Sequence, residues 1–341
     1  MAVTIKDVAA IAGVSPSTVS RVCNDNPSIS KETRERVRKA MAQLGYEPSA
    51  QPGAPSAGQG TRMVGIILPP SPREIYENSF FLEAIRGISQ QCNQRWAAST
   101  IITGKDDAEI LQGIQTLCDG CQVDGFILLY SKRDDMVVDY LCEQGYLYVI
   151  IGKANQFANQ TICIDNDNLL AGREATDYLY NLGHRRIGYL GSEGEYMFSS
   201  DRKSGYHLSL LQHGLPLRPE YCVQMDNPLS DGTGNLHQLL SLADPPTAIV
   251  VSDDILAVAL ERSCVQLGKR IPDDISIVSF NNSLFAQLTS PQLTSVEINS
   301  FQLGFEAATQ VLNHADNPDL MAAKIVVPHR IVERDSCRKL I

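Results

Sequence analysis

From residue 63 onward, short apolar runs alternate with segments of helical periodicity, and this alternation constrains the fold more strongly than any other feature. Most of the runs are continuously apolar, as strands of a parallel sheet are when both faces of the sheet are covered. Helical stretches of about 10–18 residues separate them, which fits the crossover helices of βαβ units. The eight runs are 64–68, 99–102, 125–129, 148–151, 162–164, 187–190, 248–251 and 275–278.

Eight such units exceed one doubly wound sheet, so the pattern predicts an α/β core of two similar parallel-sheet lobes. Ligands of these sheets bind beyond the carboxyl ends of the strands. Polar residues just after the runs are therefore candidate ligand contacts, although each of them taken alone is more often a helix cap or a turn residue. These residues are Lys153, Asp165, Asp253, Asp254, Asn281 and Asn282.

The first 48 residues have a different pattern and predict three short helices, over about 5–12, 16–24 and 30–44. Thr4 and Asp7 have the spacing of a capping box at the start of the first helix. Apolar residues recur at helical spacing in each segment. Gly13 can end the first helix in a left-handed conformation. The segment is therefore a small all-α domain that precedes the α/β core.

Two short helices joined by a turn around a glycine form the helix-turn-helix pattern. Ser15 suits the cap of the second helix and Pro16 its first position. Small polar residues follow, so this helix end can enter the major groove and its N–H groups can meet phosphate. The hydrophobic pattern alone also allows a plain three-helix bundle with no role in DNA binding.

The net charge supports DNA binding only when it is divided along the chain. The whole sequence of 341 residues has a formal charge of −10. Residues 1–48 contain seven Lys or Arg against five Asp or Glu, so they carry +2 and the remainder carries −12. The N-terminal segment is thus mildly basic, which permits contact with nucleic acid without establishing it.

Five sequence motifs in the first 48 residues decide between these alternatives. They are Ile5-Lys6-Asp7-Val8-Ala9, Ala12-Gly13-Val14-Ser15, Thr18-Val19-Ser20-Arg21-Val22, Arg36-Val37 and Leu44-Gly45-Tyr46-Glu47-Pro48. Together they closely resemble the DNA-binding headpiece of the lactose/galactose repressor family, which implies binding to a pseudo-palindromic operator. The operator contacts that the resemblance implies are Thr4, Ser15, Pro16, Ser17, Thr18, Ser20, Arg21 and Asn24.

Residues 49–62 depart from the family pattern and have the composition of a flexible linker. In the family a hinge helix follows the headpiece, and its Ala, Arg and Leu fall on Pro52, Gly53 and Pro55 here, while Ser49 replaces an Asn. A proline inside a helix costs about 3 kcal/mol and a glycine about 1 kcal/mol. The chain therefore either couples to DNA without a hinge helix or binds DNA more weakly than its relatives.

The resemblance continues through the core and implies a periplasmic-binding-protein-like fold, with two lobes joined by three crossovers. We expect the first lobe at about 63–160 and 292–322, and the second at about 161–291 and 323–341, with 326–335 returning to the second lobe. The matching sequence motifs include Asn78-Ser79-Phe80-Phe81, Val123-Asp124-Gly125, Ile164-Asp165-Asn166-Asp167-Asn168, Gly183-His184-Arg185-Arg186, Asp201-Arg202 and Asp253-Asp254.

Within the family, the core is most similar to the maltose-operon repressors of Gram-positive bacteria. The sequence motifs that support this similarity are Tyr76-Glu77-Asn78, Thr103-Gly104-Lys105-Asp106, Ile151-Gly152-Lys153 and Ser279-Phe280-Asn281. This resemblance implies maltose or a maltodextrin as the effector. The implied effector contacts are Phe80, Phe81, Lys153, Asp165, Arg202, Asp253 and Asn281, of which Asn281 replaces the usual Asp of the family.

Several other classes of protein are disfavoured. The sequence has no nucleophile elbow, no phosphate-binding Gly-Lys-Ser/Thr loop and no dinucleotide fingerprint after the first run, so we expect no enzyme and no cofactor. The six histidines show no metal spacing, and the Cys118/Cys121 pair has no second pair to complete a zinc site. We expect the nine cysteines to be reduced thiols.

No run of 18 apolar residues and no secretion signal is present, so we expect a cytoplasmic protein without a membrane partner. The resemblance to the repressor family implies a homodimer, whose two headpieces would read the pseudo-palindromic operator. Two alternatives share part of these features. A global catabolite regulator that responds to a phosphorylated partner protein would have the same headpiece. A soluble sugar-binding protein would have the same core but no reason to carry a helix-turn-helix. The resemblance to maltose-type regulators implies induction, in which the sugar weakens DNA binding, while co-repression, the opposite effect, occurs in the wider family.

Overall fold

The computed structural model describes residues 4–23, 29–44, 46, 62–70, 78–192, 196–225 and 233–340. The chain divides into two compact units, residues 1–61 and 62–341. Of the predicted linker at 49–62, only Arg62 is among the described residues. The interrupted hinge helix at Pro52, Gly53 and Pro55 therefore lies outside the described residues and stays a prediction.

The first unit contains three helices, and their bounds differ by no more than one residue from those expected. The helices are α1 (Ile5–Ala12), α2 (Pro16–Cys23) and α3 (Lys31–Leu44). Asp7 accepts hydrogen bonds from the backbone N–H and the hydroxyl of Thr4, at 2.8 and 2.7 Å, which fixes the start of α1. Gly13 ends α1 at a φ of 64°. Val8, Val19 and Val37 are fully buried and join the three helices.

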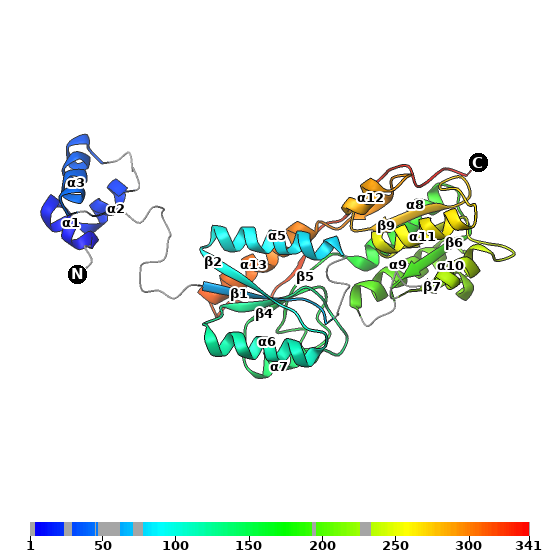
Figure 1. The fold of residues 1–341 in the computed structure, drawn as a ribbon, viewed down its shortest axis with the longest axis horizontal. Coiled ribbons are helices and arrows are strands. Elements are labelled where there is room, and N and C mark those ends of the chain that lie inside the picture. The colour runs from blue at the N-terminus through cyan, green and yellow to red at the C-terminus, as the bar shows by residue number, and fades with distance from the viewer. Residues whose placement is uncertain are drawn as a thin grey trace. The chain divides into compact units, whose positions relative to one another are not determined.

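The first lobe of the second unit is a six-stranded parallel sheet in the order β11-β5-β4-β3-β1-β2 (Figure 1). Its strands are β1 (Arg62–Ile67), β2 (Ala97–Ile102), β3 (Gly125–Leu128), β4 (Tyr148–Ile151), β5 (Ile162–Asp165) and β11 (Lys324–Val326). Helices α5 (Ser79–Gln94) and α13 (Ser300–Asp316) cover one face, and α6 (Asp107–Gly120) and α7 (Met136–Glu143) cover the other. Neighbouring residues such as Ile66 and Ile67 therefore enter two different cores.

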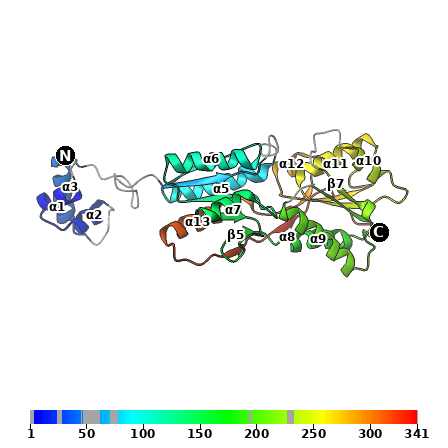
Figure 2. The same ribbon diagram turned by 90° about the horizontal axis from the view of Figure 1, so that it is seen from below.

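The second lobe repeats this architecture, with strand order β12-β10-β9-β8-β6-β7. Its strands are β6 (Ile187–Gly191), β7 (Cys222–Gln224), β8 (Ala248–Val251), β9 (Ser276–Phe280), β10 (Thr294–Glu297) and β12 (Arg330–Val332), of which only β12 is antiparallel to its neighbour among the described pairs. Helices α8 (Asn168–Asn181) and α9 (Met197–Gln212) cover one face, and α10 (Thr233–Leu240) and α11 (Asp254–Gln266) cover the other (Figure 2). A 3-10 helix η1 (Pro219–Tyr221) and the short α12 (Leu284–Leu288) complete the lobe.

The chain passes between the lobes three times, as the resemblance implied, after β5, β10 and β11. Sheet pairing corrects the expected lobe boundaries. Strands β5 and β11 pair within the first sheet although 161–291 and 323–341 were assigned to the second lobe, and β10 pairs within the second sheet although 292–322 was assigned to the first. Each crossover follows the end of a strand, so each boundary lies a few residues later than expected.

Candidate functional site

Helix α2 is the part of the first unit that the sequence predicts to meet DNA. Ser15 caps it, because its hydroxyl accepts from the backbone N–H of Thr18 at 3.2 Å. Thr4, Ser15 and Pro16 are exposed and Thr18 is half-exposed, while Val19 and Val22 are buried beneath them. The described side chains at the start of α2 are thus small and accessible, as those of a recognition helix need to be.

The other predicted operator contacts are only partly described. Ser17, Ser20 and Arg21 lie on α2, but their side chains are outside the described part of the chain, and so is all of Asn24. Their role in DNA binding stays a prediction from the sequence.

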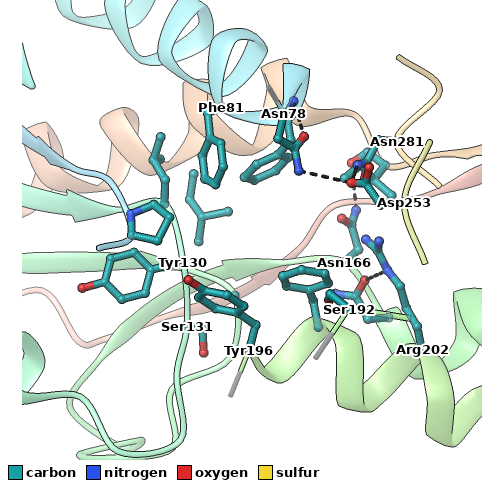
Figure 3. Close-up of a pocket in the computed structure, with 18 of the residues that line it drawn as sticks. Asn78, Phe81, Tyr130, Ser131, Asn166, Ser192, Tyr196, Arg202, Asp253 and Asn281 are labelled. Atoms are coloured by element: carbon teal, nitrogen blue, oxygen red, sulfur yellow. Dashed lines mark hydrogen bonds between the residues drawn. The ribbon is translucent and has the colours of Figure 1, made fainter. Parts of the chain in front are cut away.

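A cavity lies between the two lobes of the second unit, where the strands of both sheets end (Figure 3). Residues at or just after β3, β4 and β5 line it from the first lobe, and residues just after β6, β8 and β9 line it from the second. This is the edge at which doubly wound sheets bind their ligands. Six of the predicted effector residues line the cavity, namely Phe80, Phe81, Asp165, Arg202, Asp253 and Asn281.

Asp253 joins the two lobes at this cavity. Its Oδ1 caps α11 by accepting from the N–H of Ile255 at 2.8 Å, and its Oδ2 accepts from the side-chain amide of Asn281 at 2.5 Å. The same Oδ2 accepts from the amide of Asn78, at the start of α5 in the first lobe, at 3.1 Å. Asn78 is held in turn by the N–H of Phe80, which donates to its Oδ1 at 2.9 Å.

The amide of Asn281 is aimed by its backbone. Asn281 follows β9 with a φ of 94°, a left-handed conformation that Asn adopts more readily than most residues other than glycine. The turn points its side chain at Asp253. The two remaining polar candidates from the sequence have structural partners instead. Asp254 accepts from Ser279 at 2.5 Å inside the second lobe, and Asn282 donates to Glu297 at 2.8 Å.

Arg202 is almost fully buried, and its guanidinium is held by the protein itself. Its Nε donates to Asn168 at 2.9 Å and its Nη1 donates to the backbone oxygen of Ser252 at 2.7 Å. The guanidinium also lies 5.0 Å from the ring centre of Phe198 and 4.3 Å from that of Phe280. Arg202 can therefore line a ligand site as a positioned donor, with two of its five N–H groups already bonded to the protein.

The acids of the cavity have perturbed protonation. Burial raises the pKa of Asp165 to about 7, although the nearby cations Lys153 and Arg202 act against this shift. Burial, and next the charge of Asp254, raise the pKa of Asp253 to about 6. Both acids exchange protons close to neutral pH, and each can accept hydrogen bonds from a ligand once it is ionised.

Aromatic residues form the remaining wall of the cavity. Phe81 and Tyr130 come from the first lobe, and Tyr196 and Phe198 precede and begin α9 in the second. The rings of Tyr196 and Phe198 are stacked, with centres 6.0 Å apart and planes 18° apart. No local motif marks Tyr130, Tyr196 or Phe198, so none of them was predicted from the sequence.

Lys153 is the one predicted effector residue that does not line the cavity. Its ammonium group forms an ion pair with Asp201 on α9, so it joins the lobes beside the cavity. The neighbouring Gly152 lines the cavity in its place. The turn after β4 therefore brings a backbone position to the cavity and directs the lysine side chain past it.

Among the described residues, no group of three or more His, Cys, Asp or Glu is arranged to hold a metal ion. In the same part of the chain, no helix is both long and apolar enough to span a bilayer.

Comparison with known proteins identifies both units. The family model for bacterial regulatory proteins of the lacI family matches residues 4–49. The model for a periplasmic binding protein-like domain matches residues 176–337.

Curated relatives match along nearly the whole chain. The chain is 34% identical to the HTH-type transcriptional regulator MalR of Streptococcus pneumoniae, over 98% of this chain and 100% of the relative. It is 33% identical to MalR of Staphylococcus xylosus, over 98% of each. It is also 30% identical to the catabolite control protein A of Priestia megaterium, over 99% of this chain and 100% of that protein.

Solved structures agree with this similarity. A putative transcriptional regulator LacI from Bacillus cereus subsp. cytotoxis matches with a TM-score of 0.79 and 34% identity, over 82% of this chain and 100% of that one. A complex of the transcriptional regulator CelR with cellobiose matches with a TM-score of 0.75 and 27% identity, over 98% of this chain and 100% of that one. Since 34% identity extends over 98% of the chain, the chain belongs to the lacI family of bacterial regulatory proteins and is a DNA-binding transcriptional regulator.

Proposed function

We propose that this protein is a transcription repressor whose affinity for operator DNA is controlled by an uncharged sugar, maltose or a maltodextrin, bound between the lobes. One observation carries the proposal. A cavity at the carboxyl ends of both sheets combines acids and amides with aromatic rings, which is the mixture that recognises the hydroxyls and apolar faces of a sugar. The operator contacts that we assign are those predicted from the sequence.

The charges of the cavity favour a neutral ligand. Asp165 and Asp253 line it, and Arg202 is the one Lys or Arg among the described residues that does so. Arg202 already donates to Asn168 and Ser252. A phosphate or carboxylate on the ligand would approach two acids, whereas sugar hydroxyls can donate to the acids and accept from the amides. This favours a free sugar over a sugar phosphate.

The choice of maltose rests on similarity. Two of the relatives are named MalR, and a solved structure with 26% identity and a TM-score of 0.73 is described as a probable maltose operon transcriptional repressor, malR. CelR, which shares the fold, is described in complex with cellobiose, another disaccharide. A disaccharide of glucose is therefore the class of ligand that we expect in the cavity.

Control of DNA binding follows from the two lobes. A sugar that contacts both lobes favours their closed arrangement, and any effect of this closure on the headpieces must act reciprocally on sugar binding. Such coupling amounts to about 1–3 kcal/mol in typical cases. We expect sugar to weaken operator binding, so that the regulated genes are induced. Because its DNA target is in the bacterial cytoplasm, we assign the protein to that compartment.

We also propose that the protein is a homodimer. Leu288, at the end of α12, is 72% exposed. The apolar surface continues over both lobes along a groove between α5 and α12, where Leu82 is 68% exposed and Leu284 63%. Ile101 and Phe285 line the groove beside them. A self-complementary interface here would bury this surface against a second copy of the chain. The dimer would then supply the two headpieces that a palindromic operator needs. Leu284→Glu should shift the protein to monomers in analytical ultracentrifugation, and an unchanged dimer would contradict this interface.

Calorimetry with maltose, maltotriose, glucose, sucrose and glucose 6-phosphate tests the effector. We expect saturable binding of maltose or maltotriose and no heat with glucose 6-phosphate. Operator binding should then be measured with and without the sugar.

The similarity to catabolite control protein A supports a second candidate, a regulator controlled by a phosphorylated partner protein. Absence of heat with every sugar, together with a rise in operator affinity on addition of such a partner, would favour this candidate over a sugar-controlled repressor.

A further inference from the structure

The cavity has two ends of different chemistry (Figure 3). At the polar end, Asn78, Asp253 and Asn281 form one hydrogen-bonded group, and Asn166 and Arg202 lie beside them. These residues offer carboxylate and amide groups to several hydroxyls at once, so one sugar ring can be anchored here.

At the aromatic end, toward the other side of the cavity, Phe81, Tyr130 and Tyr196 surround the space (Figure 3). Apart from the phenol hydroxyls of Tyr130 and Tyr196, few polar side-chain groups line this end. The hydroxyl of Ser131 donates to the backbone oxygen of Lys153, and thus has a partner within the protein. A ring bound at this end would gain little from hydrogen bonds and mainly from contact with aromatic faces.

We propose that the aromatic end is a subsite for a second sugar ring, and that Tyr196 is the residue that makes the protein prefer a disaccharide to a monosaccharide. This inference rests on the proposed function. A pyranose ring has C–H groups on its faces and hydroxyls at its edge, so an aromatic side chain can cover a face while the edge remains hydrated.

Tyr196 is suited to this role because its position is fixed from both lobes. It belongs to the segment that enters α9, yet its side chain packs on the apolar cluster of the first lobe that contains Tyr130. Its backbone forms a β-bridge with Lys132, and the next residue, Met197, donates its N–H to Ser131 at 3.0 Å. The ring therefore does not need to be ordered when a ligand arrives, and this lowers the entropic cost of binding.

Phe198 extends the same surface. Its ring lies nearly parallel to that of Tyr196, with planes 18° apart, and its other neighbour is the guanidinium of Arg202 at 5.0 Å. The aromatic wall thus runs from the aromatic end back to the polar end. A ligand of two linked rings can follow this wall, with one ring at each end.

Calorimetry on the full-length protein with glucose and maltose tests the proposal. Wild type should bind maltose at least about tenfold more tightly than glucose. Tyr196→Ala should lower the affinity for maltose by about five- to tenfold, the contribution typical of one aromatic contact, and change the affinity for glucose less than about twofold. Tyr196→Phe keeps the ring and should restore most of the preference for maltose.

Asn281→Gly is the matched control at the polar end. Glycine accepts the φ of 94° found at this position, so the change removes the amide without straining the turn. This variant should lower the affinities for glucose and for maltose by similar factors, because both ligands use the polar end. A melting curve for each variant checks that it folds.

Three results would overturn the proposal. Equal losses of glucose and maltose affinity in Tyr196→Ala would show that Tyr196 acts through the lobes and not on a second ring. An unchanged maltose affinity would show that no ring contacts Tyr196. If wild type binds neither sugar, the proposed function itself fails and the subsite fails with it, which distinguishes this case from the first two.

Discussion

The hydrogen bond from Asn78 to Asp253 gives the sharpest test of how the lobes are held together. Asn78 has two roles that can be separated. Its Oδ1 caps α5 by accepting from Phe80, and its amide donates across the lobes to Asp253 at 3.1 Å. Ser and Asp are about as good as Asn at a helix N-cap. Asn78→Ser and Asn78→Asp should therefore both preserve the start of α5 while they remove the donor.

The expected magnitudes differ between the two variants. Loss of a hydrogen bond to a charged group costs about 1.5–3 kcal/mol. Asn78→Ser should thus lower sugar affinity by about ten- to hundredfold if the closed lobes are the state that binds. Asn78→Asp adds a second carboxylate opposite Asp253. At an effective dielectric of about 20, two charges at this separation repel by about 5 kcal/mol, an upper limit because the pair will take up a proton.

The sign of the pH dependence follows from this proton. The pKa of Asp253 is already raised to about 6 in the wild type, and a second carboxylate raises it further. A protonated pair can share an O–H···O bond, so the closed lobes of Asn78→Asp are favoured at low pH and disfavoured as the pH rises through the raised pKa. Asn78→Ser lacks this additional group.

The assay is calorimetry with the sugar that wild type binds, at about pH 5.5 and about pH 8. The affinity ratio of Asn78→Ser to Asn78→Asp removes every pH effect that both variants share. We expect this ratio to grow at least about tenfold between the two pH values. Equal affinities of the two variants at both pH values would refute the reasoning, since they would show that residue 78 does not face Asp253 in the state that binds sugar.

Three further predictions concern other parts of the molecule. A Cβ at Gly172 would lie 2.2 Å from a backbone oxygen of α9. Gly172→Ala should therefore lower the free energy of unfolding by about 1–3 kcal/mol and the melting temperature by several degrees. Gly120→Ala is the control and should lower neither, because a Cβ at Gly120 would meet open space. Lys153→Met should lower sugar affinity less than about fivefold, because a partly exposed ion pair with Asp201 contributes little; a much larger loss would indicate direct contact with the ligand. Arg21→Ala should weaken operator binding by about 1–3 kcal/mol in a gel-shift titration, and unchanged affinity would remove Arg21 from the interface.

The elements that sequence reasoning predicted well are those whose cause is local. The helices of the first unit begin at a cap such as Ser15 and end at Gly13 in one case. The eight apolar runs predicted from the sequence all lie on strands. The missed strands are short or polar. In β10 (Thr294–Glu297), Thr294 and Ser295 are fully buried because side chains far along the chain satisfy them, as Ser336 does for the N–H of Thr294 at 2.8 Å. No local pattern shows such partners.

The residues of the cavity also fall into those that a local pattern predicts and those that it does not. Asp165, Asp253 and Asn281 follow apolar runs, so the rule that ligands bind at strand ends was enough to select them. Tyr196 and Phe198 lie before and at the start of a helix, and only the closeness of the two lobes brings them to the cavity. Lys153 is a different case, because it does not line the cavity in this structure. Its position in the chain was right, but the side chain turns to Asp201.

The three crossovers meet at a single side chain that also lines the cavity. Asn166 follows β5 at the first crossover, and its amide donates to the backbone oxygens of Ile298 and Val327, at 3.0 and 2.8 Å, which lie at the other two. Both N–H donors are thereby used, so Asn166 has only its oxygen left for a ligand. A sugar hydroxyl that donates to this oxygen would polarise the amide and strengthen its two N–H···O hydrogen bonds, and would so act on all three strands that connect the lobes. The proposed ligand site thus lies at the hinge between the lobes, so we expect closure of the lobes and occupation of the cavity to be one event.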